Sequence, residues 1–227
     1  MGLRNGKIVL LAAVFVLLTS VAGLAQLPCG VANQITCLPW DGGSNLFASQ
    51  NDNVNGNGNF ATTYQSFTFT QTWDVESFHW VGGYFNPPNQ GPITAWTLTF
   101  YNNNAGIPGA PIATGSFPGN GGETFIANVN GFPIYVYWLY FNSFDMAAGT
   151  YWASVVPDLG FPPQWGWATA TGGTGNGGYQ CFFGSCNLTG TDFAFAVDGK
   201  AVPEPGTLIM LGTGILGLAG TLRRKLV

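Results

Sequence analysis

The amino-acid sequence predicts an all-β protein, an antiparallel β-sandwich or jelly roll, with an apolar helix at each end of the chain. Runs of alternating apolar and polar residues indicate many short strands, and clusters of Gly, Pro and Asn separate them. Between the two apolar ends no stretch shows helical spacing. We therefore expect strands, with aromatic side chains between them, to build the core.

The expected strands begin at about residue 64. Segment 64–72 alternates Phe with Ser and Thr, and segment 96–100 alternates large apolar residues with Thr. Segment 134–141 is apolar or aromatic on both faces, as expected of a central strand buried between layers. Segments 151–156 and 192–197 indicate two further strands. Turn-forming clusters separate these segments at 87–88, 102–109, 119–122, 162–163 and 172–178.

The first 25 residues have the build of a secretory signal peptide. Arg4 and Lys7 precede an apolar stretch at 8–18, which is too short to span a bilayer comfortably. Small residues follow, and we place signal-peptidase cleavage between Ala25 and Gln26. A buried helix of the folded domain would explain neither the basic start nor the small-residue exit.

Residues 202–227 form a second terminal segment with three parts. The prolines of its first part, Val202, Pro203, Glu204 and Pro205, favour an extended, helix-free chain. Residues 207–222 are uncharged and rich in Gly, and we expect a short transmembrane helix there. The basic tail should stay on the cytoplasmic side of the membrane. It consists of Arg223, Arg224 and Lys225.

This end of the chain resembles the PEP-CTERM sorting signal: Pro-Glu-Pro, a short hydrophobic helix and an Arg-rich tail, in that order. The resemblance covers residues 202–227. It implies cleavage near 202–205 by an exosortase, a membrane-embedded cysteine transpeptidase, and a link to exopolysaccharide production. The alternative is an ordinary tail anchor in which Pro-Glu-Pro occurs by chance.

Residues 26–201 remain as one exported domain, with an irregular, loop-rich start at 26–63. Between the two signals the chain has nine acidic residues, one basic residue (Lys200) and a net charge of about −8. Such a domain cannot neutralise phosphates, which excludes nucleic acid as a partner and disfavours anionic lipid surfaces. Neutral or cationic partners, divalent cations and glycans remain.

The four cysteines form two close pairs in sequence, Cys29 with Cys37 and Cys181 with Cys186. In an exported chain an even count indicates disulfides. Pairing within each close pair would form two small loops, whereas pairing between them would join the two ends of the domain. Both arrangements remain open. The spacing of the cysteines does not suit a zinc site.

A second resemblance is to a bacterial extracellular β-sandwich module that occurs beside PEP-CTERM tails and in secreted hydrolases. It covers most of residues 45–199 and depends mainly on core aromatics and turns, so it implies a fold and no activity. The segments that carry it are 48–52, 78–84, 99–109, 149–152 and 165–167.

The chain offers little that suits catalysis. His79 is the only histidine, and no Gly-x-Ser-x-Gly elbow accompanies it, so we interpret it as a sheet residue. Asp74 and Glu76 share a strand face, but none of the other acidic residues lies in a recognisable setting for a glycosidase. We predict no catalytic residues and no resident cofactor.

Two candidate binding features remain. Residues 51–56 carry oxygen-bearing side chains at alternate positions and a Gly, which makes Asp52 a candidate calcium ligand in a site unlike an EF-hand, since Thr62 stands where the bidentate Glu would be. The alternative is a flexible Asn/Gly loop. Trp165 and Trp167 share one face, and either could be exposed and stack on sugars or be buried in the core.

We therefore expect a non-catalytic protein that is exported, anchored in the inner membrane, cleaved by an exosortase and left at the cell surface or outside the cell. Exopolysaccharide is the expected partner, with weak glycan contacts. The alternative function is a secreted hydrolase that acts on glycans through paired carboxylates.

Overall fold

The computed structural model describes residues 27–30, 32–203, 206 and 213. The expected signal peptide at 1–25 and its cleavage site at Ala25 and Gln26 lie outside the described residues. So do Glu204, Pro205, the basic tail at 223–225 and all but residue 213 of the expected transmembrane helix at 207–222.

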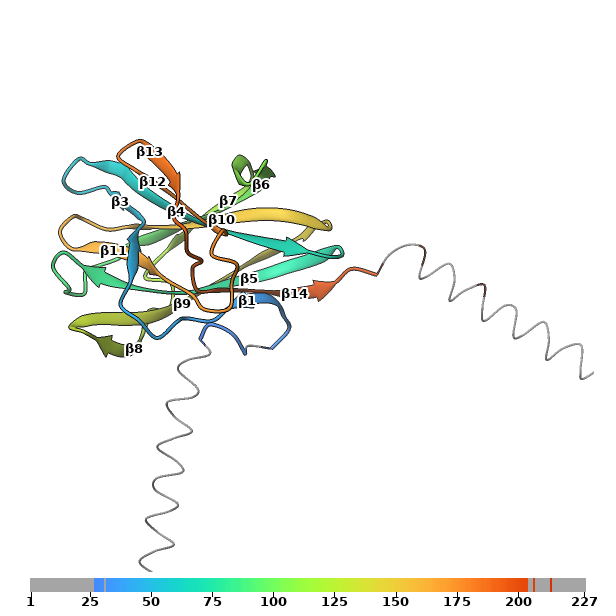
Figure 1. Cartoon of the computed structure of the whole chain (residues 1–227), viewed down its shortest axis with the longest axis horizontal. Coiled ribbons are helices and arrows are strands. Elements are labelled where there is room, and N and C mark those ends of the chain that lie inside the picture. The colour runs from blue at the N-terminus through green and yellow to red at the C-terminus, as the bar shows by residue number, and fades with distance from the viewer. Residues whose placement is uncertain (1–26, 31, 204–205, 207–212, 214–227) are drawn as a thin grey trace, which may run out of the picture.

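The described chain is built from two seven-stranded sheets that face each other, which confirms the expected β-sandwich (Figure 1). The first sheet holds β1 (Gln34–Leu38), β2 (Leu46–Ala48), β5 (Trp73–Phe85), β8 (Thr124–Val129), β9 (Phe132–Met146), β11 (Gln164–Ala168) and β14 (Phe195–Ala201). The second sheet holds β3 (Gln50–Asp52), β4 (Gly58–Phe69), β6 (Ala95–Asn104), β7 (Ile107–Pro118), β10 (Gly149–Asp158), β12 (Gly178–Phe182) and β13 (Ser185–Leu188).

Strand β5 is the centre of the first sheet. It pairs with β9 along one edge, and with β14 and then β11 along the other. The second sheet runs β13-β12-β4-β3-β10-β6-β7, with β4 also paired to β10. The pairing is antiparallel apart from a single parallel bridge between Asn51 of β3 and Asp158 of β10. The expectation of an antiparallel fold is thereby confirmed.

Aromatic rings fill the space between the sheets. Trp80, Trp96 and Trp165 are fully buried, and Tyr137 packs among them with ring centroids 5.0–5.7 Å from each. Edge-to-face contacts predominate in this cluster, as the ring quadrupoles favour. The core therefore forms from the inward positions of strands in both sheets.

The start of the domain differs from the expectation of an irregular segment at 26–63. Strands β1, β2 and β3 and the first part of β4 lie within it. Each of the first three is only three to five residues long, so no period-two pattern could develop in the sequence. They are defined by their pairing: β1 with β14, β2 with β11 and β3 with β4.

Both disulfides join the members of a close pair. Cys29 bonds to Cys37, and Cys181 bonds to Cys186. The second bridge lies between register partners of the hairpin β12–β13. Of the two arrangements left open by the sequence, the fold therefore has the pairing within each close pair.

Candidate functional site

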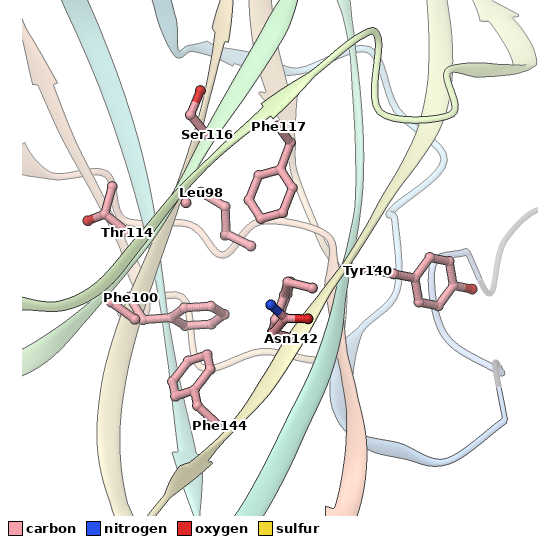
Figure 2. Close-up of a pocket in the computed structure, with 11 residues that line it drawn as sticks. Leu98, Phe100, Thr114, Ser116, Phe117, Tyr140, Asn142 and Phe144 are labelled. Carbon is pink, nitrogen blue, oxygen red and sulfur yellow. The ribbon is translucent and has the colours of Figure 1, made fainter.

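A groove of about 510 Å³ lies between β6 and β7 of the second sheet and β9 of the first (Figure 2). At this position no strand pairing in the described part of the chain joins the edges of the two sheets. Among the described residues, β7 pairs only with β6, and β9 from Leu139 onward pairs only with β5. Leu98, Phe100, Phe117 and Phe144 face the space between these strands.

The groove has the chemistry of a binding surface. Its lining contains aromatic rings and the neutral polar side chains of Thr114, Ser116 and Asn142, and no acidic, basic or imidazole group. Tyr140 is 69% exposed and points away from the groove. Figure 2 shows that Thr114 and Ser116 also point away from the groove, so its walls can contact an apolar face and bond to hydroxyl or amide groups through Asn142.

The expected sugar platform at Trp165 and Trp167 is wrong, because both side chains are fully buried in the core. The two residues do share one face of β11, but that face points between the sheets. Each indole N–H is bonded internally: Trp165 Nε1 donates to Tyr137 Oη at 3.1 Å, and Trp167 Nε1 donates to the Ala194 carbonyl at 2.8 Å. Neither ring can stack on an external ligand.

His79 lies beside Ser77 and Asp198, the three side-chain types of a hydrolase triad, but their arrangement differs from one. His79 Nε2 lies 2.7 Å from Asp198 Oδ2 and 3.1 Å from Ser77 Oγ, so one ring nitrogen faces both groups. In a triad, serine and aspartate occupy opposite nitrogens. Ser77 Oγ also donates directly to Asp198 Oδ2 at 2.6 Å. The cluster is a buried polar network within the sheet.

Asp52 is surrounded by donors, which does not suit a calcium ligand. Its Oδ1 accepts the backbone N–H groups of Val54, Asn55 and Phe161, and its Oδ2 accepts the side-chain amide of Asn57. Burial by itself would raise the pKa of this carboxyl, but the four hydrogen bonds together lower it below 3.8. The described residues contain no group of three potential metal ligands. The carboxylate instead holds the 52–57 loop.

Other acidic side chains hold a loop or lie in the paired strands of the first sheet. Asp192 accepts the backbone N–H groups of Gly175 and Gly177 and so holds the loop before β12. Glu76 forms an ion pair with Lys200 at the surface. Asp74 is the cross-strand partner of Asp145 and lies outside the groove.

A carboxylate that the sequence analysis did not single out is Glu123. It accepts hydrogen bonds from Tyr84 and Tyr137 at one oxygen and from Gln90 at the other. Burial, reinforced by the carboxylate, raises the pKa of both tyrosines far above 10, so both phenols remain donors. Only the fold brings Glu123 to these residues, since it lies 39 positions from Tyr84.

The C-terminal end of the domain leads directly into the remaining candidate segment. Strand β14 ends at Ala201, the Val202 N–H then donates to the Thr72 carbonyl at 3.1 Å, and Pro203 follows. A comparison with protein families matches the PEP-CTERM protein-sorting motif to residues 201–225. The chain carries a PEP-CTERM sorting signal. This signal marks an exported protein that is anchored at the membrane before an exosortase cleaves it.

The PEP-CTERM motif begins where the folded domain ends, so cleavage near 202–205 would leave the sandwich complete. No helix in the described part of the chain is long and apolar enough to cross a membrane. A search of curated proteins finds no match to the chain.

Proposed function

We propose that this is a non-catalytic surface or extracellular-matrix protein, which an exosortase releases from its membrane anchor and which then associates with exopolysaccharide. The PEP-CTERM motif at 201–225 carries the first part of the proposal. The position of the motif supports it, because a protease that acts just beyond Ala201 meets Val202 and Pro203, which belong to no strand.

The association with exopolysaccharide is supported by the character of the domain. Its groove is neutral and rich in aromatic rings, which suits the apolar faces and hydroxyls of sugars. Its net charge of about −8, with a single Lys and no Arg, favours a neutral glycan over an acidic one. Three of the acidic side chains are engaged: Asp52 and Asp192 hold loops and Glu76 pairs with Lys200, while the adjacent Asp74 and Asp145 lie outside the groove, which favours the non-catalytic alternative.

Intact-mass spectrometry of the protein from the cell envelope and the culture medium tests the sorting step. We expect a chain that begins at Gln26 and ends near 202–205, and that keeps its C-terminus when the exosortase is deleted. A full-length C-terminus in the inner membrane of wild-type cells would contradict the proposal.

A second measurement addresses the exopolysaccharide. In a strain that makes no exopolysaccharide, we expect the cleaved protein to move from the matrix fraction to the soluble medium. Retention of the same amount of cleaved protein on these cells would show that another component holds it.

A further inference from the structure

The hairpin β12–β13 presents two phenylalanine rings at its tip. Phe182 is 40% exposed and Phe183 is 67% exposed, and the Cys181–Cys186 disulfide closes the turn that carries them. Phe183 has a φ of 46°, a left-handed conformation that a bulky side chain rarely adopts. Such a conformation persists only where the surrounding structure enforces it, and here the disulfide and the strand pairing do so.

The tip forms one wall of a pocket of about 150 Å³. Phe60 lies at its base, stacked on Phe183 with a centroid distance of 5.2 Å and an interplanar angle of 27°. Phe161 and Phe182 approach Phe60 edge-on at 6.0 Å each. The pocket thus has aromatic walls from three separate parts of the chain and less than a third of the volume of the groove between β7 and β9.

Amide side chains supply the polar part of this pocket. Gln164 is only 6% exposed, lines the pocket, and forms no side-chain hydrogen bond with any other described residue. Its amide atoms are open to solvent in the pocket, where they can bond to water or to a ligand. Asn57 and Asn86 also line the pocket and are exposed. Its lining contains no charged side chain.

The pocket lies at the end of the sandwich opposite to the C-terminal exit. Val202 is bonded to Thr72, at the turn between β4 and β5, whereas Phe182 pairs with Ala61 near the start of β4. The part of β4 from residue 61 to residue 69 separates the two positions and spans about 26 Å at ~3.3 Å per residue. Figure 1 shows the β12–β13 hairpin and the end of β14 at opposite ends of the domain. The pocket therefore lies far from Val202, where the chain leaves the domain.

We propose that this pocket binds one sugar unit of a neutral polysaccharide, which deepens the proposed function and depends on its glycan-associated part. The apolar C–H face of a sugar ring would pack on the phenylalanine rings, and the amides would bond to its hydroxyls. The volume suits a single ring. The absence of a cationic lining residue, together with the negative net charge, disfavours uronic acids and other anionic sugars.

Native affinity electrophoresis of the cleaved, disulfide-bonded protein tests this site. The gels would contain dextran, the neutral fraction of the producing strain's own exopolysaccharide, or alginate as an anionic comparison. We expect retardation by a neutral polysaccharide and none by alginate. Phe183→Ala and Gln164→Met should each weaken it by about tenfold, because one removes the stacking ring and the other removes the amide at nearly constant volume.

Phe125→Ala is the matched control, since Phe125 is 57% exposed on β8 and lies outside the pocket. It should bind as the wild type does. Unchanged retardation in both Phe183→Ala and Gln164→Met would overturn the proposal, as would the loss of retardation only in Phe117→Ala, which would place the glycan in the groove between β7 and β9. Failure of the wild type to bind any neutral polysaccharide would also overturn it.

The tests separate this inference from the sorting proposal. Cleaved protein in the matrix, without any retardation by neutral polysaccharide, would contradict the sugar pocket and leave sorting intact. A change of mobility with protein concentration in gels without polysaccharide, abolished by Phe183→Ala, would instead assign the tip to a contact between copies and overturn the inference.

Discussion

At the scale of single residues, buried carboxylates organise the loops of this domain. Asp52 and Asp192 each accept several N–H groups from Gly- and Asn-rich turns that have few apolar contacts of their own. Backbone N–H groups in such turns need acceptors, and a carboxylate satisfies several at once. Asp52 and Asp192 therefore serve loop structure.

Replacement of Asp52 by Asn should lower the free energy of unfolding by about 2 kcal/mol at pH 7, because charge-assisted hydrogen bonds are lost. The folded pKa lies below the ordinary 3.8, so the stabilisation is complete above about pH 4 and disappears as the pH falls through the folded value. Urea unfolding at pH 7 and at low pH should show the difference between wild type and variant shrinking with acid.

Asp145→Asn is the control for this measurement, since Asp145 is exposed. Its unfolding midpoint should stay close to that of the wild type at pH 7. A loss of unfolding free energy in Asp52→Asn that is equal at both pH values would contradict the role of the ionised carboxylate.

At the scale of the element, β5 shows why a strand can contain adjacent glycines. A Cβ on Gly82 would lie 2.2 Å from Trp165 Cζ2 and 2.6 Å from the Gly166 carbonyl oxygen. The glycine thus allows Trp165 to pack against the strand backbone. Glycine in a strand interior often marks such a close approach.

Gly82→Ala should therefore destabilise the protein by about 3 kcal/mol, because the well-packed Trp165 has no space into which it can move. Chemical unfolding measures the loss. The double variant Gly82→Ala/Trp165→Phe should lose less than the sum of the two single variants, since the smaller ring relieves part of the clash. Strict additivity would contradict direct contact.

The disulfide-bonded hairpin β12–β13 gives a second prediction at the scale of the element. Because Phe183 has a positive φ, Phe183→Gly should be more stable than Phe183→Ala by about 1 kcal/mol. Phe125 lies in β8 and has no positive φ, so it is the comparison, and there Gly should be less stable than Ala. Thermal unfolding of the four variants would reveal the expected reversal, and the same order at both sites would exclude backbone strain at Phe183.

At the scale of the whole molecule, the segment that an exosortase would cleave begins where the last strand of the folded domain ends. The last strand, β14, pairs with both β1 and β5 and ends at Ala201, one residue before the proline segment. Cleavage can therefore remove the anchor without removing a strand.

A chain that ends at Pro203 should accordingly unfold at the same urea concentration as the full chain in detergent. A chain that ends at Asp198 should be clearly less stable, because it lacks the pairing of residues 199–201 with β5 and the ion pair of Lys200 with Glu76. Equal loss of stability in both truncations would show that the sorting segment is part of the fold.

The sequence by itself determined the β-sandwich class and the sorting motif, because alternation along a strand and an ordered string of residues are both local patterns. It left disulfide pairing open and did not reveal β1, β2 and β3. Those strands are too short to carry a period, and the partners of β1 and β2 lie far away in the chain.

Only the tertiary structure decided which face of a strand is buried. The period-two pattern places Trp165 and Trp167 on one side of β11 but does not say which side meets the other sheet. Likewise, Gln164 and the phenylalanines of the pocket beside the β12–β13 tip come from three separate segments of the chain, and the aromatic rings look like core residues in the sequence. Periodicity fixes relative orientation within a strand, whereas burial depends on what the fold packs against it.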